Sequence, residues 1–134
     1  MKLEIEALAR HRLERAREAF EEGQHLMAKR AFTGAVNRFY YAAFHGARSL
    51  LATKQVDSSR HSGVISLFQD HFVKTGQVAL ETAKALSHAY EKRQKTDYGD
   101  FATIEPGEAE RIREEVQAFI EECGRLLDRL ISEG

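Results

Sequence analysis

Two stretches of the sequence place polar side chains at helical spacing within otherwise apolar segments. In the stretch NRFYYAAFHGAR (37–48), gaps of four, four and three residues put Asn37, Tyr41, His45 and Arg48 on one helical face. An arginine offers a planar fork of donors to phosphate oxygens, and an imidazole can exchange a proton near neutral pH. This face predicts a phosphate or ribose site. A solvated or salt-bridged face and a contact between protein copies are the alternatives.

The second stretch ends a later apolar stripe, where gaps of four, three and four join Leu86, Tyr90, Arg93 and Asp97. An arginine and an aspartate one turn apart usually form a modest ion pair at the end of a helix. Here the pair continues a stripe that begins apolar. Asp97 would therefore orient Arg93 and leave donors free for a phosphate. A purely structural ion pair is the alternative interpretation.

Other site chemistry finds little support in the sequence. The single cysteine, Cys123, excludes an internal disulfide and a multi-thiolate metal site. His61 and His71 have no cysteine or carboxylate at metal-ligand spacing, and no glycine-rich phosphate loop is present. We therefore expect no metal and no cofactor. Lys+Arg 20 against Asp+Glu 21 leaves a net charge of −1, so any binding of nucleic acid would have to be local.

The elements that position these residues are predicted to be helices throughout, because apolar residues recur at the helical period. We expect a first helix that ends at Gly23, a second over about 28–51, a short third capped by Asp57, Ser58 or Ser59, a fourth over about 78–98, and a last helix with Pro106 in its first turn. Five helices joined by short turns predict an all-α fold, an up-and-down four-helix bundle with one short extra helix.

Length and composition predict one helical domain over residues 1–134, with a core from about 3 to 131. Hydrophobic residues make up 43% and charged residues 31%, as is ordinary for globular proteins. No apolar run is long enough for a membrane span, and residues 1–15 lack the apolar core of a secretory signal. We therefore expect a cytoplasmic protein that does not associate with membranes.

Three clusters in this order resemble the HEPN domain family. NRFYYAAF is followed by HSGVISLF and then by RQKTDY, before a loop and a long last helix, so the resemblance spans about residues 3–130. The matching positions are Asn37, Arg38, Tyr40, Tyr41, Ala42, Phe44, His61, Gly63, Arg93, Asp97 and Tyr98. More narrowly, the chain resembles the small stand-alone branch that is often encoded beside a minimal nucleotidyltransferase.

The resemblance implies a homodimer of helical bundles with a role linked to nucleotides or RNA. Many family members look like metal-independent ribonucleases, in which a histidine follows an arginine after four to six residues. In this chain Arg93 is followed by Asp97 and Tyr98 instead, and an aspartate is a poor general acid at neutral pH. Arg38 and His45 satisfy the spacing, but on the preceding long helix.

Three hypotheses about function follow. The first is a nucleotide- or RNA-linked binding partner of a minimal nucleotidyltransferase, in a toxin–antitoxin-like pair. Its nucleotide- or phosphate-binding residues would be Asn37, Arg38, Tyr41, Arg93, Asp97 and Tyr98, and the Tyr98 hydroxyl could be modified by the transferase. The second is a metal-independent ribonuclease toxin, in which Arg93 or Arg38 stabilises phosphate charge and His45 moves a proton. The third is a structural adaptor without a ligand.

Overall fold

Five helices and one π-helical turn make up the computed structural model, which describes residues 1–134. The elements are α1 (Leu3–Ala28), α2 (Phe32–Thr53), α3 (His61–Phe68), the π-helical turn Gln69–Val73, α4 (Leu80–Tyr98) and α5 (Pro106–Glu133). There is no strand, so the predicted all-α class and the five-helix order are confirmed. None of these helices has the combination of length and hydropathy that crossing a bilayer requires.

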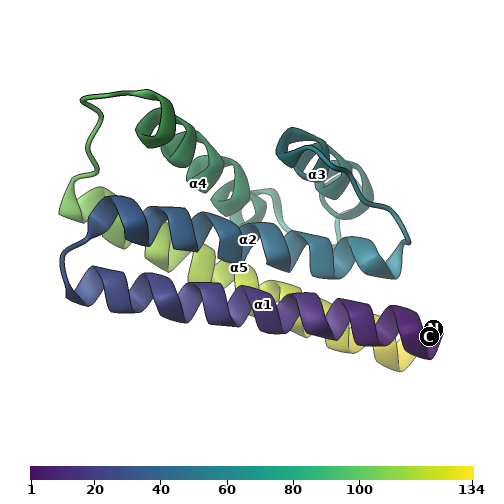
Figure 1. Cartoon of the computed structure of the whole chain (residues 1–134). Helices are drawn as coiled ribbons and strands as arrows, with labels where there is room; N and C mark the ends of the chain where they lie inside the picture. The colour runs from purple at the N-terminus through teal and green to yellow at the C-terminus, as the bar shows by residue number, and fades with distance from the viewer.

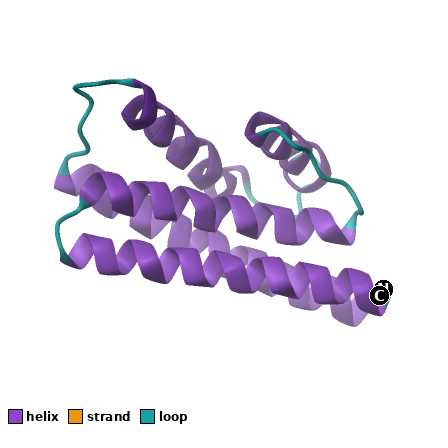
Figure 2. Cartoon of the chain, in the orientation of Figure 1, coloured by secondary structure: helices purple, strands orange, loops and turns teal.

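The central element of the bundle is α2. It runs antiparallel beside α1, packs against α4 and α5, and meets the short α3 near its C-terminal end (Figure 1). The longer loops precede α3 and connect α4 to α5 (Figure 2). More than half of the α2 side chains are buried, including the large rings of Phe39 and Tyr40. A charged side chain on this helix therefore has few directions in which it can reach water.

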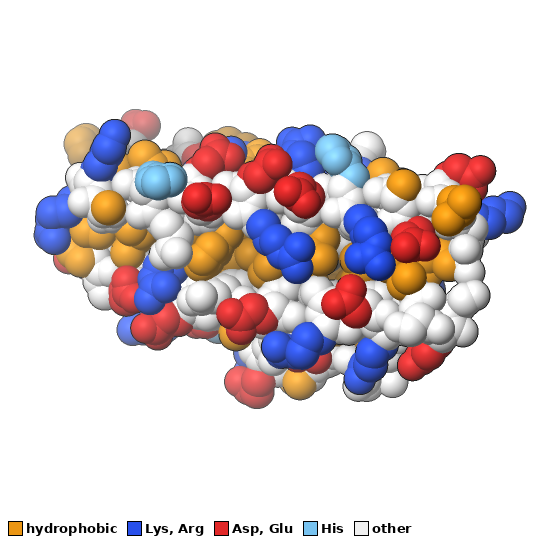
Figure 3. Space-filling view, turned by 90° about the horizontal axis from the view of Figure 1, so that it is seen from below, with side chains coloured by type: hydrophobic (Ala, Val, Ile, Leu, Met, Phe, Trp, Pro, Cys, Tyr) orange, Lys and Arg blue, Asp and Glu red, His pale blue; other side chains and the backbone are white.

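The last helix, α5, begins where the sequence predicts. Pro106 occupies its first turn, and Glu105 and Glu108 form a reciprocal capping box around its start. Its buried face includes Val116, Phe119 and other apolar side chains that pack towards α2. From the side of α1 and α5, apolar side chains form a band between charged ones (Figure 3).

The predicted end of the first helix is wrong. Gly23 does not terminate α1, which continues to Ala28, and the chain turns with Arg30 in the left-handed region at φ 61°. Gly23 instead allows α1 and α2 to approach closely, because a Cβ there would lie 2.5 Å from Cε1 of Phe39. The glycine is a packing requirement between helices rather than a helix stop.

The predicted caps of the third helix are also wrong. Arg60 occupies the N-cap position of α3, and no side chain caps the helix. The Ser58 hydroxyl accepts a hydrogen bond from the backbone N–H of Arg60 at 3.2 Å, before the helix begins. The Asp57 carboxylate is bound by Arg12 and Arg48 of the two preceding helices. A long-range ion pair has displaced the local capping interaction.

Replacing Gly23 by alanine should destabilise the protein, even though alanine is the better helix former, because the added methyl group would overlap the ring of Phe39. We expect the free energy of unfolding, measured by urea denaturation, to fall by about 1–3 kcal/mol. The matched control is Gly107→Ala, since a Cβ at Gly107 meets nothing within 4 Å. Similar stabilities of the two variants would contradict a close approach at Gly23.

Candidate functional site

The guanidinium group of Arg93 lies against two tyrosine rings of α2. Its central carbon is 5.2 Å from the ring centroid of Tyr40 and 5.2 Å from that of Tyr41. Both distances are within the range of a cation–π interaction. Arg93 projects from α4, so this contact joins the two polar stretches that stood out in the sequence. We refer to Arg93, Tyr40, Tyr41 and the residues in contact with them as the Arg93 cluster.

The carboxylate of Asp97 lies beside this guanidinium. Arg93 Nε is 3.1 Å from Asp97 Oδ2, and only 19% of the arginine side chain is exposed. The Nε–H does not meet that oxygen at a hydrogen-bonding angle, and it is buried without any other partner. An unsatisfied buried donor costs about 1–3 kcal/mol. The contact with Asp97 is therefore an electrostatic one, and the Nη groups, which are not enclosed and donate no hydrogen bond within the protein, are the donors that a ligand can reach.

His61, the first residue of α3, completes the Arg93 cluster. Its Nδ1 lies 2.6 Å from the hydroxyl oxygen of Tyr40, in a hydrogen bond whose donor depends on the imidazole tautomer. Its ring stacks on Phe44 with 4.6 Å between centroids. Burial, and then the charge of Arg93, lowers the pKa of His61. The neutral imidazole is thus favoured, and it is held in place by a phenol and an aromatic ring.

The hydroxyl of Tyr40 is a positioning group rather than an acid. Burial raises its pKa above the ordinary range of a phenol, and the charge of Arg93 only partly opposes this shift. Tyr40 therefore remains protonated at neutral pH and can hydrogen-bond His61 without ionising. Its ring is fully buried, and the guanidinium of Arg93 packs against it.

Arg38 approaches the same site from α2. Its guanidinium carbon is 5.0 Å from the ring centroid of Tyr41, so Tyr41 contacts both Arg38 and Arg93. Arg38 Nη2 donates to Asn37 Oδ1 at 3.1 Å, and its Nη1 is 3.7 Å from the carboxylate of Glu22. Two cationic groups therefore flank one half-buried tyrosine.

His45 lies farther along α2, where its ring neighbours those of Tyr41 at 6.2 Å and Phe44 at 5.7 Å. Burial, followed by the charges of four arginines, lowers the pKa of His45 to about 4. These arginines, in decreasing order of effect, are Arg15, Arg48, Arg38 and Arg12. They belong to α1 and α2. The charges that act on His45 are thus those of the contact between α1 and α2, and Arg93 is not among them.

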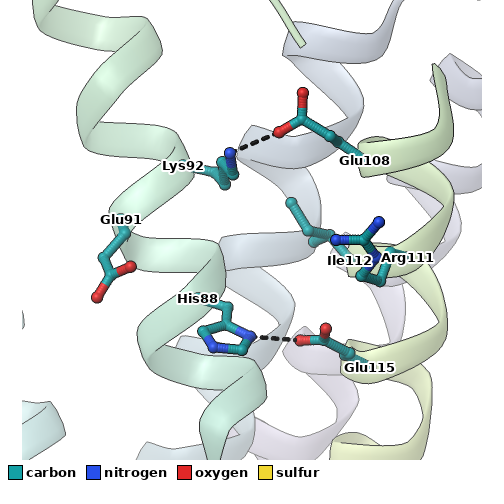
Figure 4. A pocket seen from close by; sticks show the side chains of 7 residues that line it. All are labelled: His88, Glu91, Lys92, Glu108, Arg111, Ile112 and Glu115. Atoms are coloured by element: carbon teal, nitrogen blue, oxygen red, sulfur yellow. Dashed lines mark hydrogen bonds and ion pairs between the residues drawn. The ribbon is translucent and has the colours of Figure 1, made fainter. Parts of the chain in front are cut away.

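Another hollow lies between α4 and α5, outside the Arg93 cluster (Figure 4). Its charged side chains pair across the two helices: His88 Nδ1 is 2.9 Å from Glu115 Oε2, and Lys92 Nζ is 2.5 Å from Glu108 Oε2. These pairs connect the end of the bundle at which Arg93 lies to α5. No three side chains of His, Cys, Asp or Glu converge anywhere as a set of metal ligands.

Comparison with known proteins identifies the family, because residues 9–126 match the HEPN domain model. The chain belongs to the HEPN domain family. A "UPF0332 protein" of Thermotoga maritima is 34% identical over 116 residues, which cover 87% of this chain and 88% of that protein. Two proteins of Methanocaldococcus jannaschii named "Putative toxin" are 31% identical over 126 residues (94% of this chain, 83% of theirs) and 33% over 128 residues (96% and 92%).

In this HEPN protein the structure gathers some of the predicted site residues and separates others. Arg93, Asp97, Tyr41 and Arg38 lie in one run of contacts, and Asn37 joins it through Arg38. Tyr98 follows Asp97 directly, but its side chain is 81% exposed and makes no ring contact with the cluster.

The helical spacing of polar residues did not identify His61 as a residue of the site. It belongs to another helix than Arg93 and the tyrosines, so no periodicity connects it to them. The signal that could have found it was the HSGVISLF motif, which begins with this residue.

The environment of His45 predicts a distinctive titration. Because its native pKa of about 4 lies below the unfolded value of about 6.5, the unfolded chain binds the extra proton first as the pH falls. The stability that neutral His45 contributes is therefore complete above pH ~6.5 and is lost as the pH falls towards ~4. NMR should show His45 titrating near pH 4 in the native protein and near pH 6.5 in urea. A native midpoint near 6.5 would contradict the burial of His45 and the effect of the surrounding arginines.

Proposed function

We propose that this HEPN protein binds a phosphate group of a nucleotide or of RNA at the Arg93 cluster. The observation that carries the proposal is the guanidinium of Arg93, which is held against two tyrosine rings while its Nη groups, unlike the enclosed Nε, remain accessible and donate no hydrogen bond within the protein. A guanidinium that is already oriented loses little conformational entropy when it binds a phosphate. Charge-assisted hydrogen bonds to phosphate are also stronger than neutral ones.

The surroundings of Arg93 support an anionic ligand. Arg38 adds a second guanidinium on the ring of Tyr41, and Asp97 is the carboxylate within ion-pair distance of Arg93. The half-buried Tyr41 offers a ring edge and a hydroxyl beside these cations, which suits a nucleoside phosphate better than a free inorganic ion. With a net charge of only −1 for the whole chain, such a local site is the means by which it would attract an anion.

The proposed context is a toxin–antitoxin-like pair in which the protein, as a homodimer, is the partner of a minimal nucleotidyltransferase. Two relatives carry the word toxin in their names, which supports the toxin part of this context. The exposed side chain of Tyr98 supports the transferase part, because its hydroxyl is accessible to a modifying enzyme. Purification of the tagged protein from its own cells tests the association, and recovery of no nucleotidyltransferase would oppose it.

Replacing Arg93 by glutamine should abolish most of the phosphate binding. We expect AMP and a short single-stranded RNA to raise the melting temperature of the wild-type protein, since a ligand that binds only the native state stabilises it. The affinity of Arg93→Gln for both should fall roughly tenfold or more, as expected for the loss of a charge-assisted hydrogen bond. Arg125→Gln on α5 is the control, because Arg125 is exposed and pairs with Glu122. Equal binding by Arg93→Gln and Arg125→Gln would oppose the proposed site.

A second function, a metal-independent ribonuclease, is favoured by the position of His61. In this mechanism the RNA 2′-oxygen attacks the adjacent phosphorus, neutral His61 accepts the 2′-hydroxyl proton, and the bond to the 5′-oxygen breaks as that oxygen takes a proton from water. Arg93 stabilises the charge that develops on the phosphate oxygens. The nitrogen that accepts the 2′-hydroxyl proton is Nε2, which requires the tautomer in which Nδ1–H of His61 donates to the hydroxyl oxygen of Tyr40, and this hydrogen bond holds the imidazole in place.

An assay of RNA cleavage in EDTA tests the ribonuclease. We expect His61→Gln to lose activity by roughly 10²–10⁴-fold, the usual contribution of a general base. The control His88→Gln should retain most of the activity, because His88 pairs with Glu115 in the hollow between α4 and α5, outside the Arg93 cluster. Circular dichroism would show whether both variants are folded. Cleavage by neither the wild type nor the variants, or equal cleavage by all three, would exclude this function.

A further inference from the structure

The contact between α1 and α2 gathers four arginines and His45 along one line. We call this line the α1–α2 seam; it consists of Arg12 and Arg15 from α1 and of Arg38, His45 and Arg48 from α2. The antiparallel register is set by contacts at both ends. Arg12 Nη1 donates to the backbone oxygen of Arg48 at 3.1 Å, and Arg38 lies 3.7 Å from Glu22. Between these contacts, Arg15 of α1 is brought opposite His45 of α2.

The carboxylates within ion-pair distance of the α1–α2 seam lie at its two ends. Asp57 Oδ2 is 2.6 Å from Arg48 Nη2 and 3.3 Å from Arg12 Nη2, which ties the loop before α3 to both long helices. Glu22 lies at the opposite end, where its contact with Arg38 is long and exposed. The four guanidinium groups thus have only two carboxylates within ion-pair distance. The α1–α2 seam therefore carries two positive charges that no carboxylate at that distance compensates.

Arg15 is the cation in the middle of this line. It is exposed and forms no ion pair, although Glu18 follows it by one turn on α1. Facing Arg15, His45 adds no charge at neutral pH, since burial and the surrounding arginines lower its pKa to about 4. The middle of the α1–α2 seam is thus a neutral imidazole beside an unpaired guanidinium.

Two aromatic rings lie between the arginines of α2, the half-buried ring of Tyr41 and the buried ring of Phe44. Arg38 lies over Tyr41, and Arg48 lies over Phe44 at 5.7 Å from its ring centroid. Arg38 and Arg48 are ten positions apart, which corresponds to about 15 Å along the helix and is more than one phosphate group can occupy. Sites for single-stranded nucleic acid combine cations that follow the backbone with aromatic rings next to them. An acidic protein partner would be bound by the arginine charges alone, so the neighbouring rings favour a nucleic-acid ligand.

We propose that the α1–α2 seam is a phosphodiester-binding subsite that continues the Arg93 cluster, so that the ligand is a single-stranded oligoribonucleotide rather than a mononucleotide. This inference rests on the proposed phosphate binding at Arg93. Tyr41 joins the two sites, because its ring contacts both Arg93 and Arg38. Arg15 binds a backbone phosphate directly, while Arg12 and Arg48 are held in place by Asp57.

Fluorescence anisotropy with a labelled single-stranded RNA of about ten nucleotides, a length within the usual site sizes, tests the inference. We expect Arg15→Gln to weaken RNA binding roughly tenfold, as one lost charge-assisted contact should. Its affinity for AMP should not change. A plot of log affinity against log salt should become shallower by about 0.7, the value for one phosphate contact to a single strand.

The matched control is Arg17→Gln, which removes the same charge from the same helix. Arg17 faces α5, where it lines a hollow with Phe20 and Ile120, and it lies outside the α1–α2 seam. Its RNA affinity should stay near that of the wild type. Arg15→Lys should recover part of the lost affinity, because it restores the charge without the planar fork.

The outcomes distinguish this inference from the proposed function. If Arg15→Gln and Arg17→Gln bind RNA equally while Arg93→Gln binds neither RNA nor AMP, the α1–α2 seam is no subsite and the Arg93 site stands. If AMP binds the wild type as tightly as the RNA does, the inference is also overturned. If the wild type binds neither ligand, both proposals fail. Weakening by Arg15→Gln without any weakening by Arg93→Gln would overturn both proposals, because the α1–α2 seam would then not continue a phosphate site at Arg93.

Discussion

The enclosure of α2 by the other helices is the constraint on which the rest of the structure depends. A buried charge is costly unless it is paired, so the arginines of α2 must leave the interior by the few open directions. Arg48 does so by reaching Asp57, and Arg38 by lying along the ring of Tyr41. Both solutions place the long apolar stems of arginine against protein and the guanidinium at the border of the core. The polar face of this helix is a consequence of how tightly the rest of it is packed.

The same constraint accounts for the position of Arg93. Tyr40 and Tyr41 are neighbours on α2, and their rings pack edge to face, 5.2 Å apart. Together they form the surface on which a guanidinium from α4 can lie. The structure stabilises the charge through the rings and Asp97 but leaves Nε without a partner. A residue placed for stability alone would be expected to satisfy that donor, because unsatisfied buried groups are rare in native proteins.

Helical periodicity was enough to predict the fold, since long amphipathic segments are the strongest signal that a single sequence carries. The errors arose where contacts between distant segments decided the outcome. Gly23 resembles a helix stop locally, and only the ring of Phe39 on the next helix explains it. Asp57 is a good cap by residue type, yet Arg48 binds it instead. Tertiary contacts override local preference in both cases.

The candidate site could be predicted only in part, for the same physical reason. Arg93, Asp97 and Tyr41 were found because each belongs to a regular stripe on its own helix. His61 contacts Tyr40 only because the loop before α3 folds back over α2. The spacing of residues within a helix cannot predict such a contact between helices. The spacing of Arg38 and His45 matched a catalytic pattern, but the environment of His45 differs from that of His61. Four arginines act on the former and one on the latter.

This difference gives the two histidines different chemical roles. A histidine held neutral far below physiological pH is a weak proton acceptor, since its conjugate acid is strongly disfavoured. His45 is therefore suited to hydrogen bonding among the arginines that we propose to bind phosphate, whereas His61 is the better candidate for the proposed base. The nearly neutral chain also lacks the long-range field that draws polyanions to strongly basic proteins. At the proposed sites, affinity for a nucleic acid would therefore come from short contacts, namely oriented guanidinium donors beside aromatic rings. Such contacts favour a ligand whose phosphates and bases match their positions over polyanions in general.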